Sequence, residues 1–186
     1  TQGDLIPPAA DDSAMITSAL AAGVGPVLTL TPLGPDGNFN NSLITSLVNN
    51  EDAKSNLLSQ LLTALQEKGF QGLDIDFEYI LPEDRVPFAD FVSEARAFLS
   101  PYGYHVSVAL VPKTSDTQAG LLYAGKDYRL LGEAADSVLL MTYEWGYTYS
   151  PPMAVAPLNK VRQIVEYALT EIPREKILMG IPNYGY

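Results

Sequence analysis

The sequence predicts a parallel α/β fold, and within that class a (β/α)8 barrel (TIM barrel) with a site at its mouth. Strand-like and helical segments alternate along the chain, and successive strands start about one crossover connection apart. Residues 70–79 form a strand with acids on one face and apolar side chains on the other, which suits a barrel covered by helices on its outside. The rival, an open doubly wound sheet, would have apolar strands and a glycine-rich phosphate turn after the first strand, and the sequence has neither.

The composition limits the classes of protein and partner. The chain has 186 residues, no cysteine and 47% hydrophobic residues, so it can bury one sizeable core without disulfides. The absence of cysteine fits both a cytosolic protein and a disulfide-free exported one. A formal net charge of −11 argues against nucleic acid as a partner, because binding to phosphates depends on clustered Lys and Arg. No segment is long and apolar enough to span a membrane, and no signal peptide is visible.

Helical periodicity and stop signals define the elements before the acidic strand. Asn50 is a suitable N-cap for a long helix in which leucines recur at the helical period, and Gly69 ends that helix. Gly23 ends an earlier helix in the same way. A segment rich in Pro, Gly and Asn marks the loop at the carboxyl end of the first strand. The expected order is a helix at 11–22, a strand at 26–31, a loop at 31–41, a short helix at 42–48 and a long helix at 51–68.

The acidic strand carries the candidate catalytic residues. Because side chains alternate between the two faces of a strand, Asp74, Asp76 and Glu78 point one way and the apolar residues beside them point the other. In a parallel barrel the acids would line the interior, and Glu78 would stand at the rim. Three acids at this spacing cannot all ionise easily, so at least one of their pKa values should be raised, as an acid catalyst near neutral pH needs.

Plainer structures also place acids on alternate positions of a strand. A solvated strand face is the commonest of them, but Gly72 and the flanking apolar residues disfavour it. A calcium loop starting at Asp74 would need Gly at its sixth position and Glu at its twelfth, which here are Tyr79 and Arg85. A magnesium or manganese site built on the carboxylates stays open, although no phosphate-binding loop accompanies it.

After the acidic strand the same alternation continues. In the strand at 137–144, Met141 and Tyr143 are expected to point the same way as the acids. His105 is the only histidine and is expected to be packed or hydrogen-bonded, which argues against histidine-dependent catalysis and zinc sites. The expected elements are a helix at 85–99 that buries Phe88, Phe91, Val92, Ala95 and Phe98, a strand at 104–111, a loop at 113–126, a short helix at 128–135, a strand at 137–144, a helix at 158–171 and a strand at 176–182.

The long connection at residues 145–156 has two interpretations. It contains three aromatic residues and two adjacent prolines, a composition typical of a loop that stacks on sugars. A rigid aromatic turn that packs on itself would have the same composition. The sequence leaves both open.

Three motifs, in order along the chain, resemble glycoside hydrolase family 18. Gln71 to Glu78 is similar to the Asp-x-x-Asp-x-Asp-x-Glu signature of the family's fourth strand, with Gln71 in place of the first acid. Residues 141–144, Met-Thr-Tyr-Glu, are similar to the Met-x-Tyr-Asp of its sixth strand, with Glu144 in place of Asp. Residues 180–185, Gly-Ile-Pro-Asn-Tyr-Gly, are similar to the Gly-x-Pro-x-Tyr-Gly of its seventh strand.

The resemblance implies a (β/α)8 barrel of which this chain is a part. The motifs assign the expected strands to positions three to seven, so residues 1–186 are expected to be part of one family 18 catalytic domain that lacks the first two strands and the last. The length agrees, because a full barrel takes about 250 residues. Two sheet edges would then be exposed, and we expect the isolated segment to associate or fold imperfectly and to be weakly active or inactive.

The resemblance also implies a mechanism, substrate-assisted retention, in which the substrate's own acetamide replaces a protein nucleophile. Glu78 would protonate the glycosidic oxygen, Asp76 would orient the acetamide, and Tyr143 would hydrogen-bond its carbonyl. Asp74 would share a proton with Asp76, and the protons belong to the coupled set of acids. No metal or other cofactor is implied. The candidate substrate-binding residues are Met141, Glu144, Trp145 and Tyr184.

Residues 141–157 resemble the bacterial branch of the family that acts on spore cortex and peptidoglycan. This implies an N-acetylglucosaminidase whose partner is an N-acetylglucosamine-containing polysaccharide, with LysM wall-binding modules elsewhere in the full protein. It also implies an extracellular location, at the cell wall or spore surface of a bacterium. The alternatives are a chitinase or chitooligosaccharide hydrolase, a non-catalytic sugar-binding member of the family, and a metal-dependent hydrolase that uses the same acids.

Overall fold

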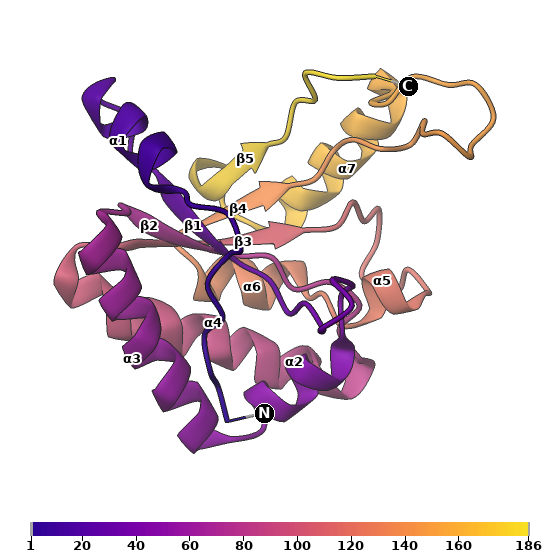
Figure 1. Ribbon diagram of the computed structural model, residues 1–186. Helices are drawn as coiled ribbons and strands as arrows, with labels where there is room; N and C mark the ends of the chain where they lie inside the picture. Colours follow the sequence, from indigo (N-terminus) through magenta and orange to yellow (C-terminus); the bar gives the residue numbers. More distant parts are fainter. Residues whose placement is uncertain (1, 186) are drawn as a thin grey trace.

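The computed structural model describes residues 2–185, which form one parallel sheet of five strands in the order β1-β2-β3-β4-β5. Each strand pairs in parallel with the strand before it in the sequence, and helices connect them (Figure 1). Consecutive parallel pairing through helices is the arrangement of a (β/α) barrel wall. The strands are β1 Val27–Leu30, β2 Gly72–Ile75, β3 His105–Leu110, β4 Ser137–Leu140 and β5 Ile177–Met179.

The helices follow the order that the sequence predicts. In Figure 1, α2, α3, α4 and α6 lie on one side of the sheet, and α1 projects away from them. The α-helices are α1 Ser13–Ala21, α2 Asn41–Val48, α3 Glu51–Lys68, α4 Arg85–Leu99, α5 Leu121–Ala124, α6 Tyr128–Ala134 and α7 Leu158–Glu171. Short 3-10 turns occur at η1 Pro82–Asp84, η2 Ser100–Tyr102 and η3 Arg174–Lys176. Only α5 lies in a segment for which the sequence predicts a loop.

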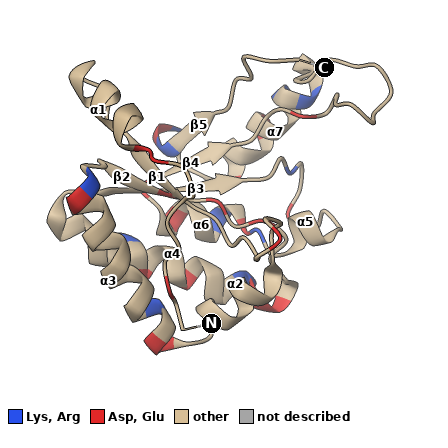
Figure 2. Ribbon diagram, viewed as in Figure 1, with Lys and Arg blue, Asp and Glu red and all other residues tan. Residues whose placement is uncertain are grey.

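Both predicted caps of helix α3 are confirmed. The side chain of Asn50 accepts a hydrogen bond from the backbone N–H of Ala53, as an N-cap does. Gly69 follows the last turn with φ of 79°, in the left-handed region that favours glycine. On this helix and elsewhere, basic residues lie among acidic ones (Figure 2), and Lys54 pairs with both Glu51 and Glu94.

No helix in residues 2–185 is long and apolar enough to cross a membrane.

The apolar face of the acidic strand packs against α4. The ring of Phe77 stacks on Phe88 and on Phe91, with centroids 5.5 and 6.0 Å apart. The predicted burial of Phe98 is wrong, because this ring points outward toward Tyr102 and is 36% exposed. Leu99, the next residue, is fully buried and ends the apolar stripe of α4 instead. Phe77, two residues beyond β2, is therefore buried against α4, and Leu73 and Ile75 on the same face are fully buried.

The regular strands are shorter than predicted at their carboxyl ends. Strands expected to reach residues 79, 144 and 182 end at Ile75, Leu140 and Met179. The backbone of Asp76 still donates to Leu30 O at 3.0 Å, and the chain then leaves the sheet. Tyr79 and Glu144 have φ of 57° and 66°, a left-handed conformation that non-glycine residues seldom adopt. The backbone therefore turns sharply just after Glu78 and just after Tyr143.

Each outer strand pairs on one side only within residues 2–185. β1 pairs with β2, and β5 pairs with β4. Apolar side chains on these strands are exposed, including Val27, Leu178 and Met179. The sheet thus has two open edges, as the sequence predicts.

The contact between Phe77 and the two α4 rings should contribute strongly to the local stability. We predict that Phe77→Ala lowers the free energy of unfolding by about 3–5 kcal/mol, because it leaves a cavity under two rings. Phe98→Ala removes the same ring from the exposed side of α4 and should cost less than about 1 kcal/mol. Urea denaturation of the two variants measures both values. Equal losses would contradict the packing described for Phe77.

Candidate active site

The side chains of the acidic strand alternate as predicted. Leu73, Ile75 and Phe77 are buried, whereas the acids between and after them are half-buried. Asp74 lies opposite Ser107 of β3 in the parallel register, and the Ser107 hydroxyl donates to Asp74 Oδ1 at 2.5 Å. The acids therefore face away from α4, on the same side of the sheet as the Ser107 hydroxyl.

Asp76 has an acceptor atom without a partner. Its Oδ1 is buried, and no hydrogen-bond donor contacts it within the described part of the chain. A buried, unpaired carboxylate oxygen is costly, and this one has its acceptor capacity unused by the described residues. Burial raises the pKa of Asp76, the positive charge of Lys126 lowers it, and the negative charge of Asp74 raises it further.

Glu78 stands just beyond Asp76 and holds its proton more tightly than an ordinary glutamate. Burial raises its pKa, and the charge of Asp76 raises it further. Lys126 opposes these effects, and Glu144 adds to them. A carboxyl group with a raised pKa, half open to solvent at the end of a strand, has the properties of a general acid.

Tyr143 belongs to the same cluster although it comes from the segment after β4, two strands away from β2. Burial raises the pKa of its phenol, and so do the charges of Asp76, Glu144, Asp74 and Glu78. The phenol therefore lies within electrostatic reach of all the candidate acids. It keeps its proton at neutral pH and can act as a hydrogen-bond donor.

Gly180, just beyond β5, leaves room for the Tyr143 ring because it has no side chain. A Cβ at residue 180 would lie 2.6 Å from Cε1 of the Tyr143 ring and 2.7 Å from Leu140 O, which is too close for either to tolerate. The backbone N–H of Gly180 donates to Leu140 O at 2.9 Å, and the Thr142 hydroxyl donates to Gly180 O at 2.7 Å. The segments after β4 and β5 are thus joined directly beneath the phenol.

The candidate substrate-binding residues are divided between two positions. Glu144 and Tyr184 come together, since the Tyr184 hydroxyl donates to Glu144 Oε1 at 2.9 Å. Met141, three residues before Glu144, is half-buried, and its backbone N–H donates to Leu110 O. Trp145 is half-buried and packs against the hydrophobic core. Of the other aromatic residues in its loop, Tyr149 is 88% exposed.

Two buried lysines near the site were missed by sequence reasoning. Lys126 is fully buried, and its ammonium donates to Ala109 O at 2.7 Å and lies 5.3 Å from the centroid of the Phe88 ring. Lys113 is also buried, and its ammonium donates to Lys126 O at 2.6 Å. Both residues lie in a segment predicted as a loop, where a lysine is usually solvated, so no sequence signal distinguished them. His105 is hydrogen-bonded to Ser137, as predicted.

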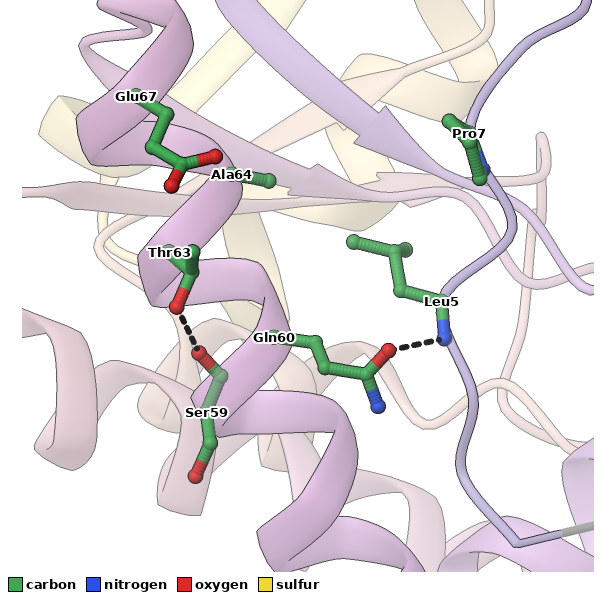
Figure 3. Close-up of a pocket in the computed structure, with 7 residues that line it drawn as sticks. All are labelled: Leu5, Pro7, Ser59, Gln60, Thr63, Ala64 and Glu67. Atoms are coloured by element: carbon green, nitrogen blue, oxygen red, sulfur yellow. Dashed lines mark hydrogen bonds between the residues drawn. The ribbon is translucent and has the colours of Figure 1, made fainter.

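A pocket elsewhere on the surface contains different residues. The pocket in Figure 3 lies between the N-terminal segment and α3, where Leu5 N–H donates to the Gln60 side chain at 3.1 Å. It contains none of the candidate residues. Among residues 2–185, no group of three His, Asp or Glu side chains could hold a metal ion.

Comparisons with known proteins agree with this geometry. Residues 33–186 match the model of glycosyl hydrolases family 18. The chain is 47% identical over 148 residues to the cortical fragment-lytic enzyme of Bacillus subtilis (strain 168), covering 80% of this chain and 34% of that protein. The chain therefore spans about a third of that relative's length.

Solved structures give the same result. The Bacillus cereus spore cortex-lytic enzyme SleL superposes with a TM-score of 0.91 at 32% identity, over 97% of this chain and 41% of that one. A chitinase from Chromobacterium violaceum ATCC 12472 superposes with a TM-score of 0.92 at 26% identity, over 100% of this chain and 58% of that one. The five parallel strands and their helices are part of a (β/α)8 barrel, as predicted.

The electrostatic order within the cluster can be tested directly. Asp76→Asn should lower the pKa of Glu78, because it removes the negative charge that most strongly disfavours ionisation of Glu78. Titration of 13C-labelled carboxyl groups by NMR measures this shift. Asp52→Asn, on the exposed side of α3, is the matched control and should leave Glu78 unchanged. An unchanged pKa of Glu78 in Asp76→Asn would show that the two acids are not neighbours.

Proposed function

The chain belongs to glycosyl hydrolases family 18, and from this premise we propose that it hydrolyses β-1,4 bonds next to N-acetylglucosamine in peptidoglycan or spore cortex by substrate-assisted retaining catalysis. One observation carries the proposal above all. Glu78, an acid with a raised pKa, shares an electrostatic cluster with Asp76 and Tyr143 at one end of a parallel sheet.

In the first step Glu78 donates its proton to the glycosidic oxygen as the bond from that oxygen to the anomeric carbon breaks. The carbonyl oxygen of the substrate's N-acetyl group forms a bond to the same carbon, so no covalent ester with the protein is needed. In the second step Glu78, now a carboxylate, accepts a proton from water, whose oxygen attacks the anomeric carbon and opens the intermediate. Retention of configuration follows from two displacements at one carbon.

The other residues act on the acetamide. The unpartnered Oδ1 of Asp76 suits the acetamide N–H, which becomes more acidic as positive charge develops on the ring that forms. The phenol of Tyr143 can donate to the acetamide oxygen and hold it toward the anomeric carbon. Asp74, fixed by the Ser107 hydroxyl, would share a proton with Asp76 through the cycle.

The names of the relatives support a substrate class for the proposal. Proteins named cortical fragment-lytic enzyme in Bacillus subtilis, Bacillus anthracis and Bacillus cereus are 34–47% identical to this chain over at least 80% of its length. We propose the same kind of substrate here, an N-acetylglucosamine-containing polysaccharide of the spore, and a location outside the cell. Met141, Glu144, Trp145 and Tyr184 are proposed to contact the sugar. LysM modules elsewhere in the full protein stay a prediction.

Chitin is the second candidate substrate, favoured by the superposition of the whole chain on a chitinase. Incubation of the full-length protein with cortex fragments and, separately, with chitooligosaccharides distinguishes the two. Release of reducing ends from chitooligosaccharides but not from cortex fragments would favour chitin. If the protein binds these glycans but cleaves neither, a sugar-binding role is favoured. If a metal chelator abolishes the activity, a metal-dependent hydrolase is favoured. We also propose that residues 1–186 are part of a single catalytic domain, so each experiment uses the full-length protein.

Glu78→Gln tests the assignment of the acid. Because glutamine has no carboxyl proton to donate, we predict a fall in kcat of at least roughly 100-fold with substrate binding retained. Calorimetric titration with an N-acetylglucosamine oligomer measures the binding. Glu67→Gln, on the exposed side of α3, serves as the control and should keep full activity. Normal turnover by Glu78→Gln would remove Glu78 from the mechanism.

Gly180→Ala tests the position of the phenol. The added methyl group has to displace the Tyr143 ring, and a displacement of about 1 Å can lower kcat roughly 100-fold. Gly185→Ala changes the same motif at a position where nothing lies within 4 Å, and it should leave kcat unchanged. Steady-state kinetics of the two variants decide the matter. Equal kcat values would show that Gly180 does not support Tyr143 during catalysis.

A further inference from the structure

Lys126 occupies a position that the mechanism above does not use. It lies between α5 and α6, and its side chain is fully buried. Ala109 O is the only hydrogen-bond partner of its ammonium group among the described residues, and none of their carboxylates forms an ion pair with that group. A buried ammonium with one neutral acceptor is costly, since most of the hydration that it loses on burial is not replaced. The protein keeps a positive charge inside without a direct counter-ion.

Close packing fixes this lysine near the acids. A Cβ at Gly125 would lie 2.3 Å from Ile80 O, so the backbone before Lys126 touches the segment two residues after Glu78. On the other side, Asp127 pairs with Arg85 of α4 at 2.6 Å. The ammonium itself lies over the Phe88 ring, whose face attracts a cation. The charge is therefore held in place by α4, β3 and the chain that leaves β2.

The charged groups that act on Lys126 are the candidate acids themselves. Burial lowers the pKa of Lys126 to about 8, and the charges of Asp76, Glu78 and Asp74 oppose that fall. The neighbours on α4 and β3 are an aromatic ring and a backbone carbonyl, and Lys113 binds the carbonyl of Lys126 from the other side. Tyr143 and Glu144 reach the same acids from the segment after β4.

The acids respond to the lysine in a definite order. For Asp76, the charge of Lys126 is the strongest influence after burial. For Glu78, the charge of Asp76 ranks above that of Lys126. The charge of Lys126 therefore acts on both acids, and the charge of Asp76 acts on Glu78.

We propose that Lys126 is a positioning residue that keeps Asp76 ionised, and that ionised Asp76 keeps the proton on Glu78. This inference rests on the proposed function, in which the proton shared with Asp74 resides on Asp74 while Asp76 accepts the acetamide N–H, at the same pH at which Glu78 must hold a proton. Two half-buried acids this close cannot both ionise easily, so without a nearby cation both would favour their protonated forms. A buried cation with no direct partner separates their protonation states without blocking either carboxylate from the substrate.

The pH profile of the full-length variant Lys126→Met tests the proposal. Without the cation, Asp76 gains its proton at a higher pH, so the acidic limb of kcat/KM should move upward. On that limb the variant should lose about tenfold in kcat/KM toward an N-acetylglucosamine oligomer. A fall in kcat/KM that leaves the acidic limb in place would overturn the proposal, because loss of folded protein lowers the rate equally at every pH.

Lys113→Met is the matched control. This lysine is buried in the same segment and also donates to backbone carbonyls. The charged groups that affect its pKa are Asp116, Arg85 and Asp127, and none of the candidate acids. Its variant should lose stability yet keep the acidic limb of the wild-type profile. The same upward movement of the limb in both variants would contradict the proposal.

A second measurement needs no substitution at Lys126. Asp76→Asn should lower the pKa of Lys126 further below its value of about 8, because it removes a stabilising anion. NMR of protein labelled with 13C and 15N in its lysines follows this titration directly. An unchanged pKa of Lys126 would overturn the coupling. Because this measurement does not require hydrolysis, it separates failure of the coupling from failure of the proposed function, which would appear as no cleavage by the wild-type protein.

Discussion

The stacking of Phe77 on Phe88 and Phe91 is the contact on which the site depends. Because side chains alternate along a strand, burying the apolar side of β2 against α4 obliges the acids to face the opposite way. A shift of one residue in the register would exchange the two sets and bury three carboxyl groups under a helix. The hydrophobic effect thus determines the direction of the acids before any polar contact forms. The hydrogen bond from Ser107 to Asp74 then fixes the orientation of the Asp74 carboxylate on that face.

Electrostatics at the mouth of the sheet depends on this geometry. The acids come from β2 and the segment that follows it, the phenol from the segment after β4, and the glycine next to the phenol from the segment after β5. Parallel pairing brings these distant segments together at the carboxyl ends of the strands, where water is partly excluded. In such surroundings the charges affect one another strongly, which explains why the pKa values of Asp76, Glu78 and Tyr143 all rise together.

Local patterns in the sequence predicted most of the fold and the placement of the main acids. Helix α3 has its cap, its leucine period and its terminal glycine within a single continuous stretch, so nothing distant had to be known. The prediction that Phe98 is buried failed because both Phe98 and Leu99 could end the apolar stripe of the helix. Only the tertiary contacts of α4 determine which of the two is buried. Lys126 was missed because its burial depends on Ala109, Phe88 and the loop after Glu78, which are distant in sequence. The roles of the candidate residues stay predictions.

The left-handed conformations of Tyr79 and Glu144 have a consequence for how such a sheet can change during evolution. Each follows directly after a residue of the cluster, and each carries a side chain in a region of φ that favours glycine. Glycine at either position would relax the corner and make the native state easier to reach, but it would also let the preceding group swing. Selection for heat tolerance and selection for turnover would therefore pull in opposite directions at these two sites.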